Sequence, residues 1–467
     1  MARRRRSGFL ERFQTHAFTS VDIASLAFFR IFFGLLVAWR VQRVWTHDQI
    51  NQVWINPRFL FKYCGFFWVH PWPGHWLYAH WILLGILALF IAAGFFYRIS
   101  AVLFFLSQTY FFLLEQGAYV NHYYLICLFG FLFIFVPANR AFSVDAWLFP
   151  SVRAETAPAW NLWLMRTQMG VVYFFAGVAK VSPDWLRGEP MRGVLARSDV
   201  FPFLHNFFQG NLAGYLASYA SLSLDLFIVP LLLWRRTRLV AFFLAVCFHV
   251  LNARMFPIDI FPWLGIAGTT LFLSPSWPRR IFRFLPQSVA TCAVKTIVPS
   301  KRKRLATLLF AGTYAAIQVL VPLRHFLYPG GVEWTYMEHR FSWQMLLRNR
   351  RTITFFYITD PNNGETYQIQ PGRYLSTQQI LHMGWRPDMV WQFAQFLARV
   401  MPRAGPEPLK VEVRMLVSVN GRKPQLFLDP NVDLAAEPYP FVRPRWLLQV
   451  HEPLPPIGTD QSQNEFD

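Results

Sequence analysis

The sequence predicts a multi-span α-helical membrane protein, with about nine transmembrane helices and a small C-terminal α+β extracytoplasmic domain. Three observations lead to this fold class. Hydrophobic residues make up 54% of the 467-residue chain and charged residues only 15%, whereas soluble domains carry about 25% charged residues. Long apolar stretches recur over the first 325 residues, and the remaining tail shows strand-like alternation instead. Disordered, collagen-like and coiled-coil chains are excluded, because each is polar or repetitive.

Nine apolar stretches are long enough, or nearly so, to cross about 30 Å of hydrocarbon. They cover residues 22–41, 76–97, 100–118, 119–137, 159–180, 211–234, 238–254, 258–275 and 305–323. A tight turn at Gly117-Ala118 separates the third stretch from the fourth. The seventh and eighth are short, so we expect them to be tilted or re-entrant.

The net charge of +20 comes from basic residues that gather beside the apolar stretches, as in Arg3–Arg6, Arg235–Arg238 and Lys301–Arg304. No nucleic-acid recognition motif accompanies them, so no nucleic-acid partner is expected. With a cytoplasmic N-terminus, 19 Lys and Arg residues fall on the cytoplasmic side and 7 on the opposite side, which is the bias that integral membrane proteins show. An odd number of spans then places the chain after Leu323 outside the cytoplasm.

The predicted domains are therefore a transmembrane helical domain over residues 1–325 and an extracytoplasmic α+β domain over residues 326–467. One strand is expected at Lys410–Asn420, where alternate residues are apolar: Val411, Val413, Met415, Val417 and Val419. A second strand is expected at Thr352–Thr359, followed by a turn at Asn362-Asn363-Gly364. Helical spacing over Ser376–Met401 is broken by Pro387.

Ionisable residues inside a membrane are costly, so each is a candidate functional residue. The candidates are Arg30, Glu115, His122, Arg166, Lys180, Asp225 and His249. The predicted topology places Lys180, His122 and His249 in the outer half of the bilayer, on the side of the C-terminal domain. Asp225 and Arg166 are interpreted as structural partners.

Lys180 closes the apolar segment YFFAGVAK and allows two interpretations. Its ammonium group could reach the headgroups while its stem stays in hydrocarbon. Alternatively, burial could favour a neutral amine, which is a competent general base. His122, next to Asn121, and the pair His249 and Asn252, which share a helical face, could bind a ligand or make polar contacts between helices. The sequence has no HExxH, paired CxxC, phosphate loop or GxSxG motif, and no metal is expected.

Seven segments occur in an order that points to one family. The membrane part contributes YRIS (Tyr97–Ser100), NHYYL (Asn121–Leu125), SVDAW (Ser143–Trp147), YFFAGVAKVSPDW (Tyr173–Trp185) and FHVLN (Phe248–Asn252). The tail contributes RFSWQML (Arg340–Leu346) and DPNVDL (Asp429–Leu434). With these segments the chain resembles the vitamin K-dependent gamma-glutamyl carboxylase family, and the two tail motifs favour its full arrangement over the membrane part alone.

The resemblance implies an enzyme that couples oxygenation of reduced vitamin K, a phylloquinol or menaquinol, to carboxylation of glutamyl residues with CO₂. A deprotonated lysine, which aligns with Lys180, takes a proton from the hydroquinone, and His122 supports this proton chemistry. After reaction with O₂ the vitamin removes a γ-proton from glutamate, CO₂ captures the carbanion, and the vitamin leaves as its epoxide. Asn121, His249 and Asn252 match residues of the quinone pocket.

The resemblance also implies where the acceptor binds and what the partners are. Arg340, Ser342, Trp343 and Met345 lie in the family's glutamate-recognising stretch. The implied partners are the lipid bilayer, a membrane quinone and a glutamate-containing peptide or protein acceptor.

The chain departs from the animal enzymes at two places. Ala179 stands where they carry a second lysine, so Lys180 is expected to be the sole base. The chain ends at Asp467, whereas they continue into a larger lumenal domain that holds the propeptide. We therefore expect a compact bacterial homologue in the inner membrane. Two alternatives are a quinone-binding membrane oxidoreductase that lacks carboxylation and a non-enzymatic transporter or scaffold, although the repeats typical of transporters are absent from the sequence.

Overall fold

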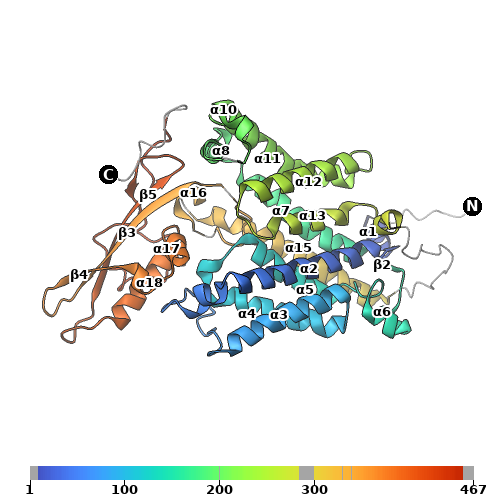
Figure 1. Cartoon of the computed structure of the whole chain (residues 1–467), viewed down its shortest axis with the longest axis horizontal. Coiled ribbons are helices and arrows are strands. Elements are labelled where there is room, and N and C mark those ends of the chain that lie inside the picture. The colour runs from blue at the N-terminus through green and yellow to red at the C-terminus, as the bar shows by residue number, and fades with distance from the viewer. Residues whose placement is uncertain are drawn as a thin grey trace, which may run out of the picture.

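A computed structural model describes residues 9–198, 200–282, 299–328, 330–337, 339–345 and 347–455. The basic residues Arg3–Arg6 and residue Leu346 of the RFSWQML motif lie outside the described residues. The described chain forms a bundle of long, roughly parallel helices, with a smaller sheet-containing domain at one end (Figure 1).

Within the part of the chain that the structure describes, nine helices make up the body of the bundle. They are α2 (Ala24–Thr46), α3 (Trp76–Ala93), α4 (Tyr97–Leu114), α5 (Asn121–Phe135), α7 (Ala159–Ala179), α11 (Asn211–Leu233), α12 (Arg238–Met255), α13 (Phe261–Thr269) and α15 (Lys301–Leu323). Shorter helices lie at its ends and in its loops: α1 (Phe9–Ala17), α6 (Val144–Leu148), α8 (Pro183–Leu186), α9 (Met191–Ala196), α10 (His205–Phe208), α14 (Trp277–Ile281) and α16 (Val332–Thr335). The strands β1 (Ser20–Asp22) and β2 (Thr156–Pro158) pair at the end opposite the sheet domain (Figure 1).

Each of the nine predicted apolar stretches overlaps one of these helices, and α2, α4, α12 and α15 extend beyond the predicted bounds. Within the described residues, six are long and apolar enough to cross a membrane, namely α2, α3, α4, α11, α12 and α15 with its continuation to Leu327. Two others, α5 and α13, are apolar but shorter, and α7 carries several polar side chains. The chain is an integral membrane protein, and the count of nine spans stays a prediction.

The lipid environment explains which side chains the bundle leaves uncovered. Leu239 and Phe243 on α12 are 73% and 65% exposed, and Leu320 on α15 is 64% exposed. Large apolar surfaces of this kind indicate a membrane or a partner rather than water. By contrast, α7 lies among α11, α13 and α15 and buries 13 of its 21 residues.

The C-terminal domain is a four-stranded antiparallel sheet in the order β4-β3-β5-β6. Its strands are β3 (Arg350–Thr359), β4 (Thr366–Ile369), β5 (Lys410–Val419) and β6 (Gln425–Leu426), and its helices are α17 (Thr377–Met383) and α18 (Pro387–Val400). Both predicted strands and the helix break at Pro387 are confirmed. The alternate apolar residues of β5 are all buried against α18, as period-2 patterning requires.

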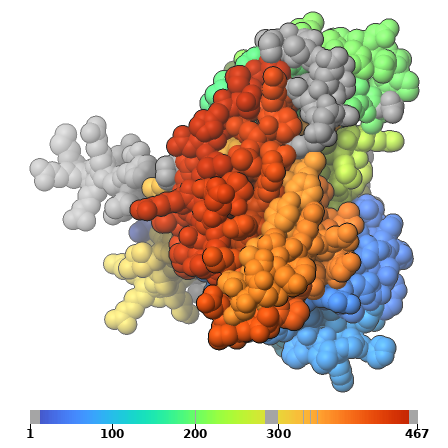
Figure 2. Space-filling view, turned by 90° about the vertical axis from the view of Figure 1, so that its left-hand side faces the viewer, coloured from blue at the N-terminus to red at the C-terminus, as the bar shows by residue number. Residues whose placement is uncertain are grey.

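Polar groups from the bundle's loops fix the C-terminal domain over the end of the bundle, where it covers most of the view in Figure 2. The Asp184 carboxylate accepts hydrogen bonds from Arg422 Nη1 (2.7 Å), Arg422 Nη2 (2.9 Å) and Asn420 Nδ2 (2.8 Å). Burial opposes ionisation of Asp184, but the bonds from Arg422 and Asn420 outweigh it and lower the pKa of this carboxyl below 3.8. A second carboxylate, Glu115, accepts from Gln379 Nε2 (2.9 Å) and the Phe61 amide (3.0 Å).

Replacing Asp184 with asparagine should loosen the docked domain, because Arg422 would lose its counter-charge in a mostly buried position. We expect the free energy of docking to fall by about 2 kcal/mol. This loss is smaller than the full cost of breaking a buried ion pair, because Arg422 is partly solvated. Hydrogen exchange of β3 and β5 in the full-length protein measures this loss. The control Glu412→Gln removes a carboxylate from β5 outside this contact, and equal exchange in both variants would contradict the assignment.

Candidate functional site

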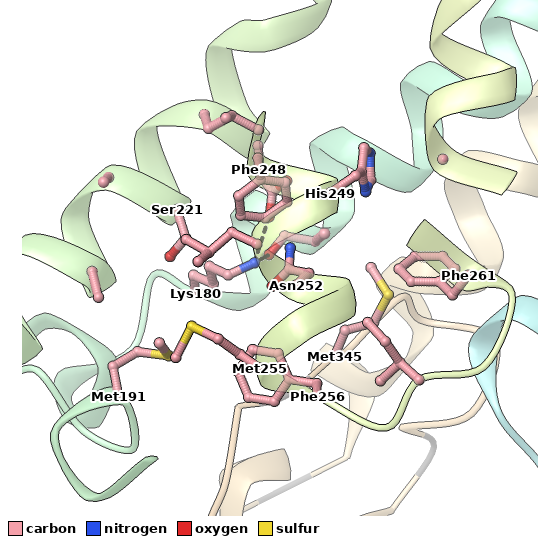
Figure 3. A pocket seen from close by; sticks show the side chains of 18 of the residues that line it. Lys180, Met191, Ser221, Phe248, His249, Asn252, Met255, Phe256, Phe261 and Met345 are labelled. Carbon is pink, nitrogen blue, oxygen red and sulfur yellow. Dashed lines mark hydrogen bonds and ion pairs between the residues drawn. The ribbon is translucent and has the colours of Figure 1, made fainter. Parts of the chain in front are cut away.

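A cavity of about 320 Å³ opens among α7, α11 and α12, at the end of the bundle next to the C-terminal domain. Most of its lining is apolar. The polar side chains are those of Lys180, Asp225, His249, Asn252, Tyr173 and Ser221, several of which Figure 3 shows around one space. Leu216 and Leu251 also line it and are 53% and 43% exposed on the outer face of the bundle. The cavity, called the membrane cavity below, is therefore accessible from the lipid.

Lys180 reaches this cavity because it stands at the C-terminus of α7 and because α7 packs closely against α11. The residue caps the C-terminus of α7, where its amide donates to Gly177 O (2.9 Å). Gly177 allows α11 to approach, since a Cβ atom there would lie 2.7 Å from the Leu226 side chain and 3.0 Å from its backbone nitrogen. One turn along α7, the Lys180 ammonium then meets the carboxylate of Asp225, the neighbour of Leu226.

The Lys180 and Asp225 side chains form a buried ion pair, with 7% and 5% of their surfaces exposed. Lys180 Nζ also lies 3.4 Å from Ala176 O and 5.3 Å from the centre of the Trp185 ring. Two opposite charges stay buried at a site like this only if each satisfies the other. The prediction that Asp225 is a structural partner is thus refined, because its partner is the candidate base itself.

His249 is oriented by a short chain of hydroxyl groups. Thr269 Oγ1 donates its one proton to Gly265 O (2.7 Å), so it must accept from the Tyr173 hydroxyl (2.7 Å). The Tyr173 hydroxyl has then used its own proton, so it accepts a hydrogen bond from His249 Nε2 (2.7 Å). This direction assigns the proton to Nε2 and leaves Nδ1 as a hydrogen-bond acceptor. Gly265 provides the space for the ring, because a Cβ atom there would lie 2.3 Å from His249 Cε1.

A second cavity of about 310 Å³ lies between the bundle and the C-terminal domain, and we call it the interdomain cavity. Its lining includes Asn121 and His122 from the start of α5 and His339, His382, Arg348 and Arg386 from the C-terminal part. Ile258, Phe261 and Met345 line both cavities. The candidates therefore separate into two groups on either side of this shared apolar wall: Lys180, His249 and Asn252 in the membrane cavity, and His122 and Asn121 in the interdomain cavity.

His122 faces Asp259, with 3.8 Å between Nε2 and Oδ2. Asp259 also accepts from Arg43 Nη1 (2.8 Å) and lies 3.5 Å from Arg40 Nε. Its backbone adopts the left-handed conformation (φ 51°), which is uncommon for residues other than glycine and often marks a functional site. The two arginines thus hold a carboxylate beside the candidate histidine.

The four predicted substrate-binding residues lie in one segment that crosses the interdomain contact. Arg340 pairs with Asp388 (2.9 and 3.3 Å), and Ser342 Oγ donates to Arg340 O (3.3 Å). Trp343 is fully buried, with its ring 5.2 Å from that of Tyr124. Met345 reaches the shared wall.

Asn121 ties this segment to the bundle, because its Nδ2 donates to Gln344 O (3.0 Å). Its Oδ1 accepts from the Tyr119 hydroxyl (3.0 Å), which in turn accepts from the Phe341 amide (2.7 Å). The segment is thereby positioned from both the membrane part and the C-terminal domain.

Positive charge dominates the interdomain cavity, and no carboxylate is among its described lining residues. Burial, reinforced by the neighbouring Arg386, lowers the pKa of His382 to about 4 and that of His339 well below 6.5. Burial also lowers the pKa of Arg386, to about 10, so that its guanidinium is charged at neutral pH while both histidines are neutral. This arrangement suits an anionic group.

The remaining ionisable candidates have structural partners. Arg30 Nη2 donates to Phe142 O (2.5 Å), and Arg166 donates from Nε to Leu271 O (2.8 Å) and from Nη2 to Leu273 O (3.2 Å). Within the described residues, no group of three or more His, Cys, Asp or Glu side chains is placed to hold a metal ion.

Comparison with known protein families shows to which family the chain belongs. A family model for the HTTM domain matches residues 18–277, more than half of the chain, and one for the lumenal domain of vitamin K-dependent gamma-carboxylase matches residues 303–453. The chain belongs to the gamma-carboxylase family. Its C-terminal part matches a lumenal domain, which indicates an extracytoplasmic position, and the family implies the use of reduced vitamin K. No solved structure matches the chain.

Sequence reasoning did not identify Tyr173 and Asp259 as parts of the site. Tyr173 precedes Lys180 by seven residues, two helical turns, so its spacing along α7 placed it on the lysine's face. Asp259 carried no comparable signal, since its role depends on two arginines more than 200 residues away in the sequence.

Gly177→Ala should destabilise the bundle, although replacing glycine with alanine inside a helix ordinarily stabilises a protein. The added Cβ meets the Leu226 side chain and backbone, so we expect a cost of about 1–3 kcal/mol and a separation of Lys180 from Asp225. Gly170→Ala on the same helix is the control, because its nearest neighbour, Val229, would lie at 3.7 Å. Thermal unfolding in detergent measures both, and equal stabilisation would refute the close helix contact.

Proposed function

We propose that this protein couples oxygenation of reduced vitamin K to carboxylation of glutamyl side chains with CO₂. The observation that carries the proposal is the buried Lys180–Asp225 pair in a cavity accessible from the lipid, separated by one apolar wall from a cationic cavity beneath the extracytoplasmic domain. A lipid-soluble quinol and a water-soluble acceptor would thus bind on opposite sides of residues such as Phe261 and Met345.

The residues of the membrane cavity fit a hydroquinone. Its walls are aliphatic and aromatic, as a naphthoquinol ring and its isoprenoid or phytyl tail require, and its polar groups are few. Lys180, His249 Nδ1 and Asn252 would contact the hydroxyl groups of the ring. Reduced vitamin K would supply, on reaction with O₂, the strong base that removes the glutamyl γ-proton, and would leave as its epoxide.

Lys180 and Asp225 together would hold and release the proton. Transfer of a proton from the Lys180 ammonium to the Asp225 carboxylate would give a neutral amine beside a carboxylic acid, and this transfer creates no net charge in the apolar site. The amine can then accept a proton from a bound hydroxyl group as a general base. With Ala179 as its neighbour, Lys180 is the one lysine among the described residues that line the cavity.

The interdomain cavity would take the acceptor. Arg386 and Arg348 present guanidinium groups to a glutamyl carboxylate, which arginine recognises well through paired hydrogen bonds. His122, held beside Asp259, would handle protons on this side of the wall. The apolar wall itself would keep water from a carbanion before CO₂ reacts with it.

Lys180→Ala should lower epoxide formation by about 10²–10⁴-fold, the usual contribution of a general base. The assay supplies detergent-solubilised protein with reduced vitamin K and O₂. Ser221→Ala is the matched control within the same cavity, since the Ser221 hydroxyl donates to Ser218 O (3.0 Å) on its own helix. Unchanged epoxide formation in Lys180→Ala would remove the lysine from the mechanism.

Arg386→Gln should raise the KM for a glutamyl peptide by about 10–100-fold, because a charge-assisted hydrogen bond is worth roughly 1.5–3 kcal/mol. Incorporation of labelled CO₂ into the peptide provides the measurement, and the exposed Arg403→Gln is the control. An unchanged KM would exclude Arg386 from acceptor binding. Epoxide formation by the wild type without any label in peptide would favour the oxidoreductase that lacks carboxylation.

A further inference from the structure

A third cavity, of about 540 Å³, is lined by His16 of α1, Val21 of β1 and residues from the start of α7. Figure 1 shows α1 and β2 at the end of the bundle opposite the C-terminal domain. Arg166 of α7 lines it, 14 residues before Lys180. At 1.5 Å per helical residue, the two side chains start about 21 Å apart, so this cavity is distinct from the site described above. By the predicted topology, it faces the cytoplasmic leaflet.

Four arginines line this cavity: Arg166, Arg235, Arg238 and Arg280, accompanied by His16. No carboxylate is among its described lining residues. The neighbouring carboxylates of Asp22 and Glu155 are bound by Arg279 instead, at 3.1 and 3.0 Å. Among the described residues, Arg235 and Arg280 form no ion pair, and both side chains are exposed. The cavity therefore concentrates positive charge that the described chain does not neutralise.

Two of these arginines are fixed in place. Arg166 donates to Leu271 O and Leu273 O, and Arg238 donates from Nε to Leu232 O (2.9 Å) and from Nη2 to Leu233 O (3.1 Å). In both arginines these hydrogen bonds are made by Nε and Nη2, and none of them is made by Nη1. A pre-positioned guanidinium loses little conformational entropy when it binds an oxyanion, and its planar fork matches phosphate oxygens.

An apolar groove of about 300 Å³ continues from this cavity along the outside of the bundle. Trp163 and Arg166 line both spaces, and the groove then runs between α7, α11 and α15 past Gly170 and Phe174. Phe174 is 52% exposed, so the groove faces the lipid. A basic cavity joined to an apolar groove matches a molecule with a phosphate at one end and a hydrocarbon chain at the other.

The geometry points to a binding site for an anionic phospholipid, with its phosphate among Arg166, Arg235, Arg238 and Arg280 and an acyl chain in the groove past Gly170. The same arginines would bind any phosphate ester, but the groove favours the lipid. The site is independent of the proposed carboxylase chemistry.

Binding of radiolabelled dioleoylphosphatidylglycerol to the full-length protein in detergent tests this site. Arg235→Gln/Arg280→Gln removes two charges without touching the bonds of Arg166 or Arg238, and should weaken binding about thirtyfold at roughly 1 kcal/mol per arginine. The matched control Lys301→Gln/Arg302→Gln removes two exposed charges from the first turn of α15. Gly170→Leu, which fills the groove, should weaken binding about tenfold by displacing roughly two methylene groups.

Competition distinguishes a lipid from a free phosphate compound. Unlabelled phosphatidylglycerol should displace the probe, whereas phosphatidylcholine, glycerol 1-phosphate and inorganic phosphate should displace it poorly. Equal weakening in the α15 control, or no saturable binding, would overturn the site. If glycerol 1-phosphate displaces the probe efficiently and Gly170→Leu has no effect, the cavity binds a soluble phosphate compound, and the assignment to a phospholipid is wrong. Thermal unfolding without added lipid checks folding, and the single Arg235→Gln and Arg280→Gln variants replace the double variant if it is unstable.

Discussion

The structure depends on one electrostatic constraint, which is that two opposite charges buried beside lipid must meet. Lys180 and Asp225 come from α7 and α11, and they meet because Gly177 lets these helices approach to backbone contact. The same approach forms one wall of the membrane cavity, and α7 also carries Tyr173, which orients His249. A single helix thus supplies the candidate base and aligns the second polar group of its cavity.

The two cavities separate a lipid-soluble reactant from a water-soluble one. Ile258, Phe261 and Met345 form the wall between them, and Met345 belongs to a segment held by both the bundle and the C-terminal domain. The contacts at Asp184 and Glu115 hold the C-terminal domain on the bundle and so help to position one side of this wall. In the proposed reaction, the base formed from the quinol and the glutamyl γ-carbon would have to meet at this wall, where water has little access.

Much of the fold, and the identity of several candidate residues, could be predicted from single residues and their spacing. Apolar length placed the helices, period-2 alternation placed β5, Pro387 marked the start of α18, and the scarcity of charge in the helices singled out Lys180, His122 and His249. Pairing across the sequence could not be predicted. Asp225 follows Lys180 by 45 residues and Asp259 follows Arg43 by 216, and no local pattern encodes which helices meet. For the same reason the separation of Lys180 from His122 into two cavities emerged only from the fold.

In the proposed mechanism Lys180 and Asp225 act as one proton-holding unit, and the decisive test is a double-mutant cycle on the rate of vitamin K epoxide formation. We expect Asp225→Asn alone to slow epoxide formation strongly. The double variant with Lys180→Ala should be no slower than Lys180→Ala alone, because the effects of residues that act as a unit are non-additive. A wild-type rate in Asp225→Asn, or additive losses in the double variant, would contradict this mechanism.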